Sequence, residues 1–191
     1  MIGEVFMVTV VSLWLPVLLS AVLVFIVSSI IHMVLSYHAG DSRPVPDEAR
    51  VMEALRPFEI PPGDYAMPRP SSTKEMSDPA FIEKMKAGPV AFITVMPNGP
   101  LAIGTSLARW FGYSLLVGAI AGYTASLTIG PGADYGLVFQ VVGTVAFAGY
   151  SLAILQSSIW WHRSWRFTFL TMFDGLVYAL LTAGTFGWLW P

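Results

Sequence analysis

The side chain best suited to chemistry is Asp174, a carboxylate inside the otherwise apolar stretch 168–191. An ionised carboxylate within a bilayer is costly unless it is neutral, paired or facing water. On a helix, Tyr178 and Thr182 share its face because they follow at intervals of four residues. Asp174 is therefore either a proton-carrying or ion-binding group, or a structural carboxyl held by Tyr or Thr or paired with Arg109.

A second group of side chains with ligand chemistry lies near the end of the first apolar segment. Imidazole and carboxylate together suit zinc, iron or copper. Because His32 and His38 are six residues apart, they do not share a helical face, so a site requires the chain to break after Tyr37 and Asp174 or another histidine to complete it. The alternative is that these histidines are half-solvated interfacial residues. The candidate metal ligands are His32, His38, Asp41 and His162.

Other catalytic patterns are absent from the sequence. There is no nucleophile elbow, P-loop, Rossmann glycine pattern or HExxH motif, and the chain has no cysteine. No catalytic residue is assigned, and no cofactor is expected. The net charge of −2 and the pI near 5.8 exclude the basic face that a nucleic-acid-binding protein needs.

The elements that must position these groups are membrane helices. The chain is 55% hydrophobic, while Asp, Glu, Lys and Arg make up only 12%. We therefore predict an all-α membrane protein with four transmembrane helices and a proline-rich cytoplasmic segment between the first and second. The predicted spans are 5–36, 110–129, 135–160 and 168–190, the last three within a membrane region 101–191.

The segment 38–100 has a different composition from the rest of the chain. It holds 11 of the 14 prolines and 7 of the 10 Lys and Arg residues. Helices are predicted at 47–56 and at 78–87, the second with an Asp78 cap, Pro79 in the first turn and Gly88 as its stop. Residues 57–70 resemble polyproline-like extended chain, and 90–96 has strand character between two prolines.

Small residues recur at helical spacing in three of the predicted spans. Such stripes allow neighbouring helices to approach closely. The residues predicted to pack at helix contacts are Gly118, Gly122, Gly149, Ala153, Gly175, Ala179, Ala183 and Gly187.

The distribution of charge predicts the orientation. Every Lys and Arg lies in 38–109 or 162–166, so the positive-inside rule places 38–109 in the cytoplasm and both termini outside, in a bacterial inner membrane. The expected partners are the lipid bilayer and either other membrane proteins or further copies of the chain. The sequence favours a non-enzymatic accessory or scaffolding subunit of a membrane complex. The alternative is a small membrane enzyme or ion- or proton-conducting protein that uses Asp174 with His32, His38 and Asp41.

Overall fold

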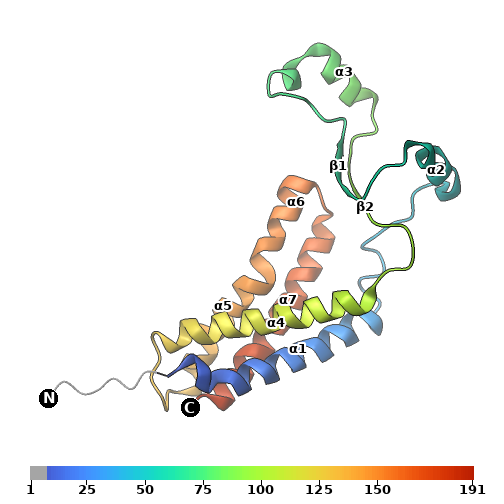
Figure 1. The fold of residues 1–191 in the computed structure, drawn as a ribbon. Coiled ribbons are helices and arrows are strands. Elements are labelled where there is room, and N and C mark those ends of the chain that lie inside the picture. Colours follow the sequence, from blue (N-terminus) through green and yellow to red (C-terminus); the bar gives the residue numbers. More distant parts are fainter. Residues whose placement is uncertain (1–7) are drawn as a thin grey trace. The chain divides into compact units, whose positions relative to one another are not determined.

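The structure is a computed structural model and describes residues 8–191 (Figure 1). The chain divides into two compact units. The larger unit contains the chain up to Ser42 together with Ala102–Pro191, and the smaller unit contains Arg43–Leu101.

The larger unit is built from long helices. A 3₁₀ turn at Val10–Leu13 leads into the first of them, and a 3₁₀ turn at Leu152–Ile154 separates α5 from α6. The helices are α1 (Trp14–Met33), α4 (Ile103–Ser126), α5 (Tyr135–Ser151), α6 (Leu155–Trp161) and α7 (Trp165–Leu189).

Three helical segments of this unit are long and apolar enough to cross a membrane: Val10–Met33, Tyr135–Trp161 and Trp165–Leu189. These lengths match a hydrocarbon core about 30 Å thick. Helix α4 has 24 residues, but Arg109 and its many Gly, Ser and Tyr residues make it less apolar than the other three. Three of the four predicted spans therefore meet both criteria, and residues 5–7 of the first predicted span lie outside the described part of the chain.

Each of the four long helices packs against two others: α7 packs against α5 and α1, and α4 packs against α1 and α5. Small residues permit this packing. A Cβ on Gly122 of α4 would lie 2.7 Å from the Phe186 ring of α7, and one on Gly187 would lie 2.7 Å from the Tyr135 ring of α5. Phe186 itself is fully buried. The glycines thus make room for large side chains from the neighbouring helix.

The other predicted packing residues follow the same rule with one exception. Gly118 faces Val17, Gly149 faces Val117, and Ala179 and Ala183 are buried. Ala153 is exposed in the 3₁₀ turn at Leu152–Ile154, so its predicted packing role is wrong. The predicted continuous helix over 135–160 is likewise interrupted there.

The smaller unit contains strands as well as helices, which corrects the prediction of an all-α chain. Strands β1 (Gly63–Met67) and β2 (Ala91–Val95) pair antiparallel, with Gly63 opposite Val95 and Met67 opposite Ala91. Pairing satisfies backbone groups that isolated extended chain would leave to water. The prediction of polyproline-like chain over 57–70 is therefore wrong at 63–67, because these residues form a strand that pairs with β2.

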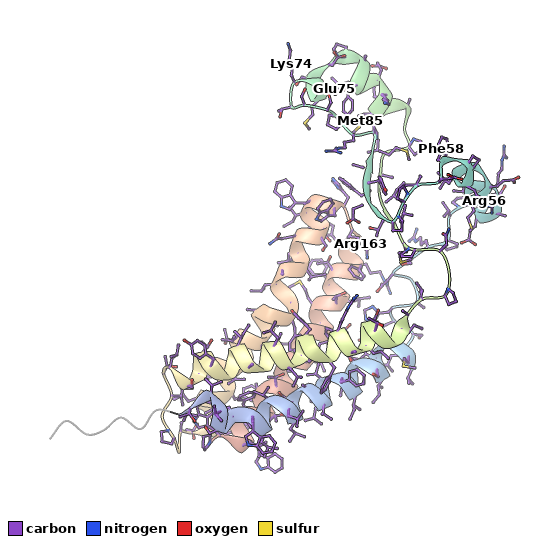
Figure 2. All side chains as sticks on the ribbon, in the orientation of Figure 1. Arg56, Phe58, Lys74, Glu75, Met85 and Arg163 are labelled. Atoms are coloured by element: carbon purple, nitrogen blue, oxygen red, sulfur yellow. The ribbon has the colours of Figure 1, made fainter. Side chains whose placement is uncertain are left out.

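Two helices complete the smaller unit: α2 (Glu48–Leu55) and α3 (Pro79–Ala87). Asp78 accepts a hydrogen bond from the Ala80 amide at 2.7 Å, and Gly88, at φ +61°, ends α3. Of the side chains labelled in Figure 2, Phe58 and Met85 are exposed apolar groups of this unit.

Candidate functional site

The two histidines of the candidate site come together because α1 ends between them. His32 lies in the last turn of α1, which ends at Met33. The following loop, 34–42, turns back so that the rings of His32 and His38 stack, with centroids 4.8 Å apart and planes inclined by 10°. Tyr37 also touches the His38 ring.

Asp174 is where this loop meets helix α7. Its side chain is 1% exposed, and its two oxygens receive different donors. The Tyr37 hydroxyl donates to Oδ1, and His38 Nε2 lies 2.7 Å from Oδ2. His32 Nε2 lies 4.0 Å from the same Oδ2. Because His32, His38 and Asp174 offer ligand atoms within 4.8 Å of one another, we call these three residues the His–Asp cluster.

A second layer of polar groups surrounds the His–Asp cluster. His38 Nδ1 lies 2.5 Å from Asp41 Oδ2, and Arg166 Nη1 donates to Asp41 Oδ1 at 2.9 Å. Arg166 Nη2 also donates to the Tyr37 carbonyl at 2.6 Å. Arg166 belongs to the first turn of α7, the helix that also carries Asp174. Helix α7 therefore holds the loop 34–42 at two places, through Asp174 and through Arg166.

The hydrogen bonds indicate where the two imidazoles carry protons. A carboxylate and a carbonyl oxygen can only accept. His38 therefore donates from Nδ1 to Asp41 and from Nε2 to Asp174, whereas His32 Nδ1 donates to the Ser28 carbonyl, 2.9 Å away. The Nε2 atoms of both histidines face Asp174. Ser28 is itself fixed, because its Oγ accepts from Trp110 Nε1 at 2.8 Å.

The same contacts shift two pKa values in the loop. Burial alone lowers the pKa of His38, but hydrogen bonds to Asp41 and Asp174 and their negative charges together raise it above its ordinary value. Burial, reinforced by the hydrogen bond to Asp174 and its charge, also raises the pKa of the Tyr37 phenol. At neutral pH Tyr37 is thus a neutral donor.

The predicted metal ligands are only partly brought together. Asp41 bonds to the back of His38 instead of joining the His–Asp cluster, and Asp174 takes its place. His162 is exposed at the C-terminal cap of α6 and is not part of the cluster.

Of the polar residues predicted to accompany Asp174, Tyr178 and Thr182 are buried with it on α7, whereas Arg109 lies apart. Arg109 is exposed, and no ion pair joins it to Asp174 in the described part of the chain, so that pairing is wrong. Tyr178, 4% exposed, packs against Trp110 and Tyr150, and its hydroxyl has no hydrogen-bond partner among the described residues. Thr182 donates to the Tyr178 carbonyl within α7.

The sequence did not predict that Tyr37 and Arg166 belong to the site. Tyr37 is adjacent to His38, and Arg166 is the last cation before α7 becomes apolar. These positions are a weak signal, because both residue types are common at membrane boundaries.

The chain matches no family model, and it has no match among curated proteins or solved structures.

Proposed function

We propose that this protein is a multipass integral membrane protein that binds one divalent transition-metal ion through the His–Asp cluster. The observation that carries the proposal is the orientation of the two imidazoles. Both donate Nδ1–H to an acceptor outside the cluster and turn Nε2 toward one buried carboxylate. Metal-binding histidines characteristically donate their second nitrogen to a carboxylate or carbonyl in this way.

The spacing of the ligand atoms suits a small cation. Bonds of about 2.0–2.1 Å in a tetrahedral site put neighbouring ligand atoms about 3.3 Å apart. His38 Nε2 is 2.7 Å from Asp174 Oδ2, and His32 Nε2 is 4.0 Å from it. Both distances are within about 1 Å of this value, and all three ligand atoms lie within 4.8 Å of one another. A bound ion would replace the proton that His38 Nε2 now shares with Asp174.

The donor set limits which metals fit. Two imidazoles and one carboxylate are typical of zinc and of divalent iron or copper, whereas magnesium and calcium prefer oxygen ligands alone. Arg166 balances the charge of Asp41, so the His–Asp cluster itself brings a single negative charge to the ion. This arrangement supports the class of small membrane enzymes and ion-handling proteins more directly than it supports a passive scaffold.

Metal analysis tests this proposal. Protein purified in mild detergent and supplied with Zn²⁺ is expected to retain about one ion per chain after desalting. His38→Gln and Asp174→Asn should each lower the retained zinc at least tenfold, since outer-shell losses alone cost 10–100-fold in affinity.

The matched control is His162→Asn, which removes an exposed imidazole from a left-handed position that Asn tolerates. This variant should retain zinc as the wild type does. If the wild type holds no zinc at saturating concentration, the metal-binding function is wrong.

The proposal includes the four-span arrangement, with α4 as the second span and the smaller unit in the cytoplasm. Both short connections and the charge distribution support it, because the turn at 130–134 has no Lys or Arg and 162–166 has two. The His–Asp cluster would then lie at the cytoplasmic end of the helices, in the inner membrane of a bacterium.

Cysteine labelling tests this topology. A cysteine at Ser71 should react with an impermeant maleimide only after permeabilisation, whereas one at Pro131 should react in intact cells. Both positions are exposed, and the chain has no cysteine of its own to interfere. Reaction of both from outside contradicts the four-span arrangement.

A second candidate, the accessory or scaffolding subunit, is favoured by the surface of the smaller unit. Of the side chains in 43–101, only that of Phe81 is buried. Apolar groups including Met52, Phe58 and Met76 are more than half exposed, as expected of a surface that binds a protein partner. On this candidate, stable association with another membrane protein should persist in the Asp174→Asn variant, which lacks zinc.

A further inference from the structure

We infer that the metal ion in the His–Asp cluster keeps an open coordination position that takes water or a small anion, as in catalytic and not structural metal sites. The inference rests on the proposed metal binding. It adds that the ion is accessible to an exogenous ligand and that the charge of the site favours an anionic one. The argument depends on the number of protein ligands, on their exposure and on their charge.

Three of the described residues offer ligand atoms, and two neighbouring groups that could serve as a fourth ligand, the Asp41 carboxylate and the Tyr37 hydroxyl, are engaged in other hydrogen bonds. Both oxygens of Asp41 are engaged, Oδ2 with His38 and Oδ1 with Arg166. The Tyr37 hydroxyl donates to Asp174 Oδ1, on the oxygen that does not face the histidines. Three protein ligands and one exchangeable position distinguish catalytic zinc sites from structural ones, which are closed by four.

The exposure of the three ligands is strongly unequal. The side chain of Asp174 is 1% exposed and that of His38 is 13% exposed, whereas that of His32 is 54% exposed. An ion held among them is therefore covered on the side of α7 and the loop. It is uncovered on the side of His32, within the larger unit that contains all three ligands. The open position would lie on this uncovered side.

Charge favours an anion at that position. A divalent ion with two neutral imidazoles and one carboxylate keeps one positive charge, and the guanidinium of Arg166 is neutralised by Asp41. A metal-bound water in such surroundings loses a proton more readily than bulk water does. Hydroxide or a small anion then completes the coordination and cancels the charge.

Cobalt spectroscopy with azide tests the inference. Co²⁺ binds zinc ligands, and its visible absorption depends on ligand number and geometry. The metal-free full-length protein, loaded with Co²⁺, should show visible bands that shift saturably as sodium azide is added. The Asp174→Asn variant should show neither the bands nor the shift.

The His162→Asn variant serves as the matched control, because it removes an exposed imidazole that lies outside the His–Asp cluster. It should leave both the bands and the azide response unchanged. Cobalt bands that do not respond to azide would show a closed site and overturn this inference while leaving metal binding intact. Absence of cobalt bands in the wild type overturns the metal-binding proposal, and the open position with it.

Discussion

Replacing His38 with alanine is expected to destabilise the metal-free protein by about 3–5 kcal/mol, the usual cost of removing one partner from a buried ion pair. The Asp174 side chain is 1% exposed, and His38 Nε2 is its partner at 2.7 Å. Without the imidazole, the carboxylate retains only the Tyr37 hydroxyl and must be buried as an unbalanced charge or bind a proton. Unfolding in mixed micelles with a chelator present measures this loss.

A double-mutant cycle separates the ion pair from the loss of packing. Asp174→Asn removes the negative charge but keeps groups that accept from Tyr37. His38→Ala together with Asp174→Asn should therefore recover much of the loss. Arg109→Gln, at an exposed position, should change stability by no more than about 0.5 kcal/mol. A coupling energy near zero between positions 38 and 174 would contradict the ion pair.

Replacing Gly175 with alanine is expected to cost about 1–3 kcal/mol, the range for overpacking a tight interior. A Cβ at this position would lie 2.2 Å from Ser151 Oγ and 3.1 Å from the Tyr150 carbonyl oxygen. The serine hydroxyl already donates to the Met172 carbonyl of α7, and the Tyr150 oxygen is backbone, so neither can withdraw freely. The same unfolding measurement reports the effect.

Gly112→Ala provides the control for this substitution. It is also a glycine inside a helix, but a Cβ there meets no atom within 4 Å. Alanine should stabilise the protein by about 0.5–1 kcal/mol, because it restricts the unfolded chain. If the two substitutions shift stability equally, α7 does not pack closely against α5 at Gly175.

The parts of the fold that follow local rules could be predicted from the sequence. Apolar length predicted the three helical segments that are long and apolar enough to cross a membrane. Asp78, Pro79 and Gly88 marked the ends of α3. The pairing of β1 with β2 could not be predicted in this way, because it joins residues about thirty apart and neither strand has a strong pattern of its own. The interruption at Leu152–Ile154 is similar, since α5 is anchored there by the contact of Ser151 with another helix.

For the candidate site, too, individual residues could be predicted from the sequence, but the contacts between distant residues could not. Asp174 stood out because a carboxylate in an apolar helix is conspicuous, and His32 and His38 stood out through their residue type. These residues come together because the loop after Met33 folds back onto α7. The spacing of residues along the sequence does not predict this contact. The sequence therefore indicates Asp41 only as a candidate ligand and not as the hydrogen-bond partner of His38, and it offers Arg109 as one possible partner of Asp174.

The sequence separation of the ligands has a mechanical consequence. His38 and Asp174 are 136 residues apart, and they connect the exit of the first long helix to the interior of the last. An ion held between them would act as a removable crosslink across the bundle. At a free metal concentration 1,000 times the dissociation constant, binding would add about 4 kcal/mol to folding stability. The concentration of free metal would then determine how strongly the loop after α1 is held to α7.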